Sequence, residues 1–336
     1  MAINKAMQAV LKALSYSDFD LGTSRRLVNI KAFDPLKHLY KTIDYKIYNG
    51  DYEVPTRIYI PDQQEKKGQT GPNKFPVLIF CHGGGFVTES VDTYNKVCWN
   101  LAQQTRHLVV SVDYRLAPEF RFPIGLEDCY AVVKAIFQER TIFNVDPDQI
   151  TLIGDSAGGN ITAVLSMMAR DRGEFMPKRQ ILIYPCVDND YSEHSKYPSV
   201  IENGTDYLLT RKNMQDYMEL YQTYPEDLEN PYFSPMKAED LTDLPKTLLI
   251  TAQFDPLRDE GQAFGRRLIE AGNEVEMHEI PDALHGFFAL STKYFHVKQC
   301  LEYINAFLNE GENHVSVKEN EMADIGECSE NLSCDQ

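Results

Sequence analysis

The sequence predicts an α/β protein with a mostly parallel, doubly wound sheet and helices on both of its faces. From residue 76 onward, short apolar runs with strand character alternate with longer amphipathic segments, which is the pattern of repeated βαβ units. Two glycine-rich motifs directly follow two of these runs, at the carboxyl ends of strands, where active sites of such sheets lie. The predicted strands lie near residues 76–81, 108–113, 150–153, 180–184, 246–251 and 274–280. The predicted helices lie near residues 91–105, 126–139, 157–171, 257–271 and 292–309.

The chain before the first parallel strand combines helices with a hairpin. Residues 1–38 have the apolar spacing of amphipathic helices. A hairpin follows, because apolar residues alternate up to Asn49-Gly50, a pair that favours a two-residue type I′ turn. We expect residues 1–38 to form the helical N-terminal part of a cap, and residues 39–186 together with 246–309 to form the α/β core.

Two further segments fall outside the alternation of strands and helices. Residues 187–245 are too many for a loop, and they contain a helical stretch from Arg211 to Tyr221 together with many aromatic residues. We expect them to complete the cap over the rim of the site, and extra core helices are the alternative. Residues 310–336 form an acidic tail in which Lys318 is the only Lys or Arg, and this composition predicts disorder.

Composition and charge restrict the class of protein. With 336 residues and 43% hydrophobic residues, the chain can form one large domain with insertions. A formal net charge of −17 argues against nucleic acid or an anionic membrane as a partner. A homodimer is compatible with the sequence.

The cysteines and the N-terminus indicate the compartment. The seven cysteines are odd in number and lack a C-x-x-C pair, which suits free thiols in a reducing compartment. Lys5 and Lys12 interrupt the apolar run that a signal peptide needs, and no run approaches the roughly 20 residues of a membrane span. We therefore expect a cytoplasmic protein without stable membrane association.

Two motifs together predict a serine hydrolase. The pentapeptide Gly-Asp-Ser-Ala-Gly at 154–158 lies between an apolar run and a helical segment, which indicates a nucleophile elbow with the Ser156 hydroxyl exposed. Alone, such a pattern arises by chance in about one chain in ten of this length. The second motif is His-Gly-Gly-Gly-Phe at 82–86, and three consecutive glycines after a histidine arise by chance in only about one in several hundred chains.

The glycine run fits the second requirement of ester hydrolysis, which is a set of donors for the oxyanion. The backbone N–H of Ala157 follows the nucleophile at a helix N-terminus, and glycines let a loop approach closely. We predict that Gly83, Gly84 and Ala157 form the oxyanion hole. A flexible turn is the alternative for the glycine run. We expect His82 to hold the loop through a backbone hydrogen bond, and Asp155 to support the elbow.

A nucleophilic serine also needs a general base. The order Ser…Asp…His of this kind of fold leaves four candidate histidines: His278, His285, His296 and His314. His285 is the predicted base, because it follows the last predicted strand in a loop, whereas the other three fall in a strand, a helix and the tail.

The base in turn needs an orienting carboxylate. Asp255 is the predicted acid, since it lies at the mouth of the loop after the strand near 246–251. Asp282 is the alternative, because it is close to the base in sequence. Asp259 and Glu260 fit the first turn of the next helix, where its dipole favours negative charge.

With these residues the chain resembles the hormone-sensitive-lipase-like group of α/β-hydrolases, which includes many bacterial carboxylesterases and acetyl esterases. The matching segments follow in family order and span most of residues 40–309: 82–86, 113–119, 154–160, 255–260 and 285–287. The resemblance implies an α/β-hydrolase fold with a helical cap and no metal or cofactor. It implies the triad Ser156, Asp255 and His285, with Gly83, Gly84 and Ala157 as oxyanion hole. We interpret Arg115 and Glu119 of the matching segment 113–119 as buried polar partners.

The expected function is hydrolysis of small-molecule esters with short to medium acyl chains, through an acyl-enzyme. Phe86, Tyr207 and Phe287 are the predicted lining of the substrate pocket. An amidase or peptidase on the same scaffold is the closest alternative. A non-catalytic small-molecule receptor, like the plant gibberellin receptors of this family, is the other alternative. Those receptors lack the catalytic histidine, which this chain has at His285.

Overall fold

The structure of this chain is a computed structural model that describes residues 21–23, 25–26, 37–50, 52–62, 75–138 and 145–310. Most of the predicted N-terminal part of the cap, and all but the first residue of the predicted acidic tail, lie outside the described residues.

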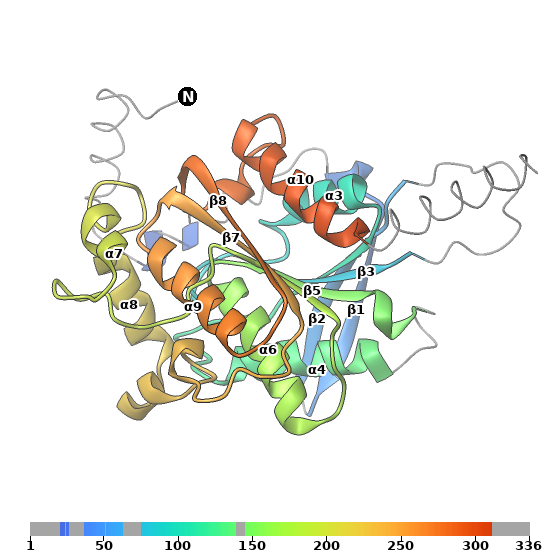
Figure 1. The fold of residues 1–336 in the computed structure, drawn as a ribbon. Coiled ribbons are helices and arrows are strands. Elements are labelled where there is room, and N and C mark those ends of the chain that lie inside the picture. The colour runs from blue at the N-terminus through green and yellow to red at the C-terminus, as the bar shows by residue number, and fades with distance from the viewer. Residues whose placement is uncertain are drawn as a thin grey trace, which may run out of the picture.

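One eight-stranded sheet organises the molecule, in the order β1-β2-β4-β3-β5-β6-β7-β8 (Figure 1). The pairs β1–β2 and β2–β4 are antiparallel, and every later pair is parallel, which confirms the predicted mostly parallel sheet with an antiparallel start. The strands are β1 (Thr42–Asn49), β2 (Tyr52–Tyr59), β3 (Val77–Cys81), β4 (Leu108–Val112), β5 (Ile150–Asp155), β6 (Arg179–Ile183), β7 (Lys246–Phe254) and β8 (Val275–Leu284).

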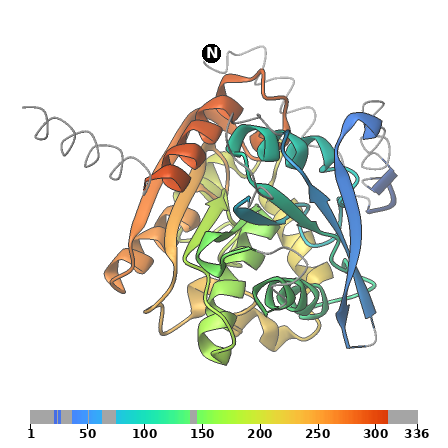
Figure 2. The same cartoon turned by 90° about the vertical axis from the view of Figure 1, so that its right-hand side faces the viewer.

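Helices cover both faces of the sheet, with α3 and α10 on one face and α4, α6 and α9 on the other (Figures 1 and 2). The α-helices are α3 (Asn95–Thr105), α4 (Ile124–Gln138), α6 (Ala157–Arg172), α7 (Pro198–Asn203), α8 (Arg211–Tyr221), α9 (Arg258–Glu270) and α10 (Phe295–Asn309). The 3-10 helices are η1 (Lys37–Leu39), η2 (Pro147–Gln149), η3 (Pro225–Glu229), η4 (Pro235–Lys237) and η5 (Phe287–Ala289).

The period-2 geometry of the strands divides their side chains between two cores. In β3, Leu78 and Phe80 pack with the helices α3 and α10, whereas Ile79 and Cys81 pack with α4 and α6. All five residues of this strand are buried. Burial on both faces explains why the parallel strands appear in the sequence as continuous apolar runs rather than alternating ones.

The order of the strands brings the two glycine motifs together. β3 and β5 are neighbours in the sheet, and Cys81 pairs with Gly154 in their register. The His-Gly-Gly-Gly-Phe segment follows β3 and the elbow follows β5, so both emerge side by side at the same edge of the sheet.

The last strand is longer than predicted. β8 continues through Pro281 to Leu284, because an irregularity between Ala252 and Phe254 of β7 lets Phe254 pair with Leu284. His285 consequently follows the end of a strand directly, rather than lying in the middle of a loop.

The insertion 187–245 contributes α7, α8, η3 and η4, and Figure 1 shows α7 and α8 beyond the ends of β7 and β8. The predicted helix from Arg211 to Tyr221 is confirmed as α8. We call residues 82–87, which contain the His-Gly-Gly-Gly-Phe motif, the glycine loop. α8 packs on this loop, since the Tyr221 ring stacks on Phe86 with 3.9 Å between ring centroids. A role of this insertion as a cap stays a prediction.

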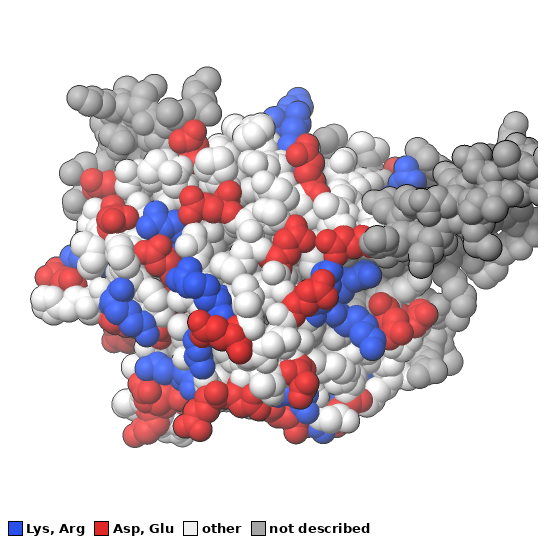
Figure 3. Space-filling model, viewed as in Figure 1, with Lys and Arg blue, Asp and Glu red and all other residues white. Residues whose placement is uncertain are grey.

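On the face drawn in Figure 3, basic side chains are scattered among acidic ones, without a continuous basic patch. Among the described residues, no helix is long and apolar enough to span a membrane.

A glycine substitution tests the contact between β3 and the helix after the elbow. A Cβ at Gly158 would lie 2.0 Å from the Cys81 carbonyl oxygen, so we expect Gly158→Ala to lower the free energy of unfolding by about 3 kcal/mol or more. Gly173→Ala is the control, because its site is open and only its φ of 64° is unfavourable, at a cost of about 1 to 2 kcal/mol. Chemical denaturation measures both, and equal losses would contradict the close contact.

Candidate active site

The residue at the junction of β5 and α6 is strained. Ser156 has φ 55° and ψ −118°, a conformation that L-residues with a side chain rarely adopt. Its neighbours must be small, because a Cβ at Gly154 would lie 2.1 Å from the Gly158 carbonyl oxygen. The Ser156 N–H donates to the Ile183 carbonyl of the adjacent strand at 2.9 Å, which anchors the turn. The predicted nucleophile elbow is therefore present as a tight strand-to-helix turn.

A continuous hydrogen-bond chain joins three side chains at the elbow. The Ser156 hydroxyl lies 2.9 Å from His285 Nε2, and His285 Nδ1 lies 2.7 Å from Asp255 Oδ2. Asp255 is fully buried, and its Oδ1 accepts the Leu257 N–H at 2.8 Å. The structure thus brings together the three residues that the sequence predicted as a triad.

The other candidate acid and bases lie elsewhere. The backbone N–H of Asp282 donates to the Gln253 side chain, and Asp255 rather than Asp282 holds His285 Nδ1. His278 lies within β8 and stacks on Tyr303 with 3.7 Å between ring centroids. His296 lies in α10, and His314 is outside the described residues.

The N–H groups of the glycine loop that are available to an oxyanion differ from the predicted ones at one residue. The Gly83 N–H donates to Asp155 Oδ1 at 2.9 Å, so the prediction of Gly83 as an oxyanion donor is wrong. Gly84 and Gly85 follow with φ of 113° and 61°, and no hydrogen-bond acceptor is found for their N–H groups among the described residues. Ala157 is the first residue of α6, so its N–H has no intrahelical partner. The donors that remain available at the elbow are Gly84, Gly85 and Ala157.

The carboxylate of Asp155 is the centre of a buried network. It is 2% exposed, and its Oδ2 accepts the hydroxyls of Tyr94 at 2.9 Å and Tyr184 at 3.2 Å. Tyr184 in turn accepts the Phe288 N–H, three residues after the base. Burial raises the pKa of Asp155 to about 6, although the hydrogen bonds that the carboxylate accepts act in the opposite direction and lower it. Asp155 therefore supports the elbow as predicted, and ties it to the glycine loop.

His82 has the structural role that the sequence predicted. Its Nδ1 donates to the Gly83 carbonyl at 2.8 Å, and its ring stacks on Tyr114 with 4.4 Å between centroids. Complete burial lowers the pKa of His82, which favours the neutral ring. The Tyr114 hydroxyl donates to the His82 carbonyl and holds the start of the loop from the other side.

Arg25 is a contact of the glycine loop that sequence reasoning missed. Its guanidinium donates to the carbonyls of Val87 at 3.0 Å and Ala117 at 2.8 Å, and to both carboxylate oxygens of Glu119. Nothing in the sequence around Arg25 indicates these long-range contacts.

The same contacts correct the interpretation of the segment 113–119. The Glu119 side chain is 53% exposed and pairs with Arg25, so the prediction of a buried Glu119 is wrong. Arg115 instead pairs with fully buried Asp128 through two bonds of 2.8 Å. Asp128 is on α4, 13 residues after Arg115 and outside the matching segment, and it was not predicted as a partner.

Two of the three predicted pocket residues are buried in the core. Phe86 and Phe287 are each 2% exposed, and they pack against the rings of Tyr221 and Tyr184. Phe86 belongs to the glycine loop and Phe287 is close to the base in sequence, which explains why both were predicted to line the pocket. Their rings, however, face neighbouring aromatic rings. Tyr207 is half-buried and stacks on Phe254 with 5.0 Å between ring centroids.

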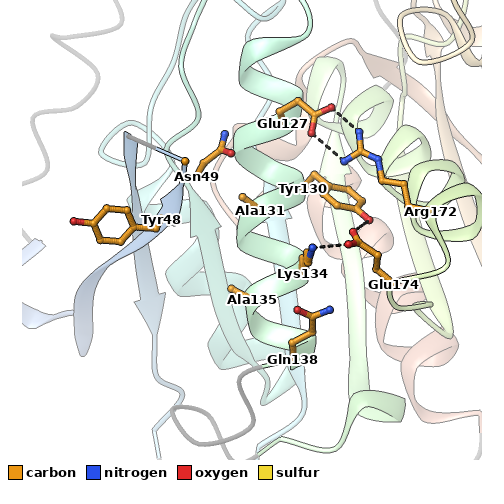
Figure 4. A pocket seen from close by; sticks show the side chains of 11 residues that line it. Tyr48, Asn49, Glu127, Tyr130, Ala131, Lys134, Ala135, Gln138, Arg172 and Glu174 are labelled. Atoms are coloured by element: carbon orange, nitrogen blue, oxygen red, sulfur yellow. Dashed lines mark hydrogen bonds and ion pairs between the residues drawn. The ribbon is translucent and has the colours of Figure 1, made fainter.

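A polar hollow of about 640 Å³ lies at the other end of α6 from the elbow (Figure 4). It is bordered by the β1–β2 turn, one face of α4 and the residues where α6 ends. Its charged side chains pair with one another: Glu127 binds Arg172 through two bonds of 2.6 and 3.0 Å, and Lys134 binds Glu174. Since α6 has 16 residues and rises about 1.5 Å per residue, this hollow is separate from the site at Ser156.

Comparisons with known proteins show the family to which this chain belongs. A family model described as alpha/beta hydrolase fold matches residues 78–289. An ethyl acetate hydrolase of Pseudomonas putida is 32% identical over 242 residues, which cover 72% of this chain and 73% of the relative. An arylesterase of Saccharolobus solfataricus is 32% identical over 290 residues, covering 85% and 90%.

A solved structure has the same fold over nearly its whole length. The hyperthermophilic esterase from the archaeon Pyrobaculum calidifontis superposes with a TM-score of 0.79 at 33% identity, and the match covers 92% of this chain and 99% of that one. The family model spans well over half of the sequence. The chain therefore belongs to the α/β-hydrolase family, in its hormone-sensitive-lipase-like group.

Proposed function

We propose that this carboxylic ester hydrolase acts on esters with short to medium acyl chains, through an acyl-enzyme on Ser156. The observation that carries the proposal is the chain of hydrogen bonds from the Ser156 hydroxyl through His285 to Asp255, at 2.9 and 2.7 Å. A serine, a base and a buried orienting acid in this order are what nucleophilic acyl transfer requires.

Acylation begins when His285 Nε2 takes the proton of Ser156 as Oγ attacks the ester carbonyl. Asp255 holds the ring in the tautomer that leaves Nε2 free, and it stabilises the imidazolium that forms. The N–H groups of Gly84, Gly85 and Ala157 are the proposed donors to the oxyanion, already placed before the reaction begins. The imidazolium then gives its proton to the leaving alcohol, and the acyl group stays on Ser156.

Deacylation repeats these steps with water as the nucleophile. His285 removes a proton from the water as it attacks the acyl carbonyl, and the same backbone N–H groups hold the second oxyanion. The imidazolium returns the proton to Ser156 Oγ, the acyl–serine bond breaks, and the carboxylic acid is released. His285 carries the proton in each of these transfers, and the backbone N–H groups donate only hydrogen bonds to the oxyanion.

Two observations support a short acyl chain. One relative is named for ethyl acetate, which is an acetyl ester. In addition, α8 lies close against the glycine loop, because a Cβ at Gly85 would come within 2.6 Å of the Tyr217 ring. Aromatic side chains of the insertion thus occupy space beside the proposed oxyanion donors and limit the room left for an acyl chain.

Acyl length can be tested with p-nitrophenyl esters from acetate to decanoate. Each methylene that fits should raise kcat/KM by up to about fourfold, since its burial contributes about 0.8 kcal/mol, until the available space ends and the trend reverses. p-Nitroacetanilide serves as the amide control and should react far more slowly. A steady rise up to decanoate, or faster turnover of the amide, would contradict the proposed substrate class.

Single substitutions test the triad. We expect Ser156→Ala to lower kcat about 10⁶-fold with the fold retained, as in other serine hydrolases. Asp255→Asn should cost about 10⁴-fold, because the imidazole remains but its tautomer is wrong. Asp282→Asn is the matched control, since it alters the rival carboxylate, and it should leave kcat within a few-fold. If Asp282→Asn were the more damaging of the two, the orienting acid would be misassigned.

The buried carboxylate beneath the elbow predicts a pH-dependent stability. The pKa of Asp155 in the folded protein, about 6, lies above its ordinary value of 3.8, so stability from this group is lost as pH rises through 6. From pH 5 to pH 8, we expect the free energy of unfolding to fall by about 1 to 1.5 kcal/mol relative to Asp155→Asn. Denaturant unfolding of both proteins at the two pH values measures this. A constant difference between them would show that Asp155 does not titrate in this range.

A further inference from the structure

A short helix of the insertion lies directly against the loop that carries the orienting acid. We call residues 253–259 the acid loop; it runs from the end of β7 into the first turn of α9 and contains Asp255. α7 faces it with two buried polar side chains, of which Ser199 is 0% and Asn203 is 4% exposed. Neither side chain touches the reacting atoms, and neither belongs to a motif described above.

Ser199 is joined to the acid loop by three hydrogen bonds. Its hydroxyl donates to the Pro256 carbonyl at 2.9 Å. Its backbone N–H donates to Asp259 Oδ2 at 2.7 Å, and the Asp259 N–H donates back to the Ser199 hydroxyl at 3.1 Å. The starts of α7 and α9 therefore cap each other, and the acid loop is fixed between them.

Asn203 binds the main chain at the acid itself. Its side-chain amide donates to the carbonyls of Asp255 at 3.2 Å and Gln253 at 3.3 Å. The Asp255 carboxylate is held from within the same loop, because its Oδ1 accepts the Leu257 N–H. A movement of the loop main chain would therefore move the carboxylate relative to His285 Nδ1.

We propose that Ser199 and Asn203 are positioning residues for the reaction, through which the insertion 187–245 sets the orientation of the Asp255 carboxylate toward His285. This inference rests on the proposed function, in which Asp255 orients the base. A misplacement of about 1 Å in such a group can cost as much as about 100-fold in rate without a change in binding. The insertion then acts on catalysis at the acid loop as well as on the room available for substrate.

A double-mutant cycle tests the proposal, with kcat and KM measured on p-nitrophenyl acetate. Asn203→Ala is made in the parent protein and in Asp255→Asn, and Ser199→Ala is made in the same two backgrounds. In the parent we expect kcat to fall about 10- to 100-fold with KM little changed. In Asp255→Asn the same changes should lower kcat less than about threefold, because the group through which they act is already impaired.

Thr210→Ala is the matched control within the same insertion. The Thr210 hydroxyl accepts the Asn213 N–H and caps α8, so its loss weakens the insertion without touching the acid loop. We expect this variant to keep kcat within about twofold of the parent. Circular dichroism and thermal melts confirm that each variant is folded, and Ser199→Ala completes the cycle alone if Asn203→Ala does not fold.

Two results would overturn the inference while leaving the proposed function intact. One is an equal loss of kcat in the parent and in Asp255→Asn, which would show that α7 acts independently of the acid. The other is a loss no greater than that of Thr210→Ala. If Asp255→Asn alone left kcat unchanged, the proposed function would fail instead, and the inference would fail with it.

Discussion

The buried carboxylate of Asp155 is the interaction on which the arrangement of this site depends. Asp155 is the last residue of β5 and directly precedes Ser156, and its carboxylate accepts hydrogen bonds from Gly83, Tyr94 and Tyr184. Removing a carboxylate from water is unfavourable, and its raised pKa records that cost. Hydrogen bonds from the three donors offset part of this cost. The same bonds hold the glycine loop and the elbow in a fixed position relative to each other. The Gly83 N–H is used for this purpose, which leaves the N–H groups of Gly84 and Gly85 as the proposed donors to the oxyanion.

The insertion contacts both loops that the proposed chemistry uses. α8 packs its aromatic rings on the glycine loop, and α7 hydrogen-bonds to the main chain of the acid loop. The nucleophile, by contrast, is positioned by the sheet itself, through the strain at Ser156 and its bond to β6. A change in the insertion is therefore expected to affect the two supporting loops before it affects the nucleophile.

What the sequence predicted correctly rests on local rules. From residue 76 onward, apolar runs and helical periodicity located the predicted strands and helices of the α/β core to within a few residues, and the Gly-x-Ser-x-Gly spacing identified the strained turn. The approach of Ser156, His285 and Asp255 followed from the position of each after a parallel strand. Some of these rules depend on residues that are adjacent in the chain, and others on the fact that parallel strands end at the same edge of a sheet. A sequence pattern contains both kinds of information.

What the sequence did not predict depends on contacts between distant segments. Which glycine N–H stays available is decided by Asp155, 72 residues after Gly83. The burial of Phe86 is decided by Tyr221 of the insertion, and the partner of Glu119 is Arg25, 94 residues earlier. No local pattern encodes such pairs, so they required the structure.

The most direct test of the account is covalent labelling of the nucleophile with diethyl p-nitrophenyl phosphate, followed by mass spectrometry of the intact protein and its peptides. The account predicts one diethylphosphoryl group per chain, on the peptide that contains Ser156, with stoichiometric release of p-nitrophenol and complete loss of esterase activity. It also predicts no labelling of Ser156→Ala. A label on another residue, or full activity in protein labelled at Ser156, would contradict the claim that this serine carries the acyl group.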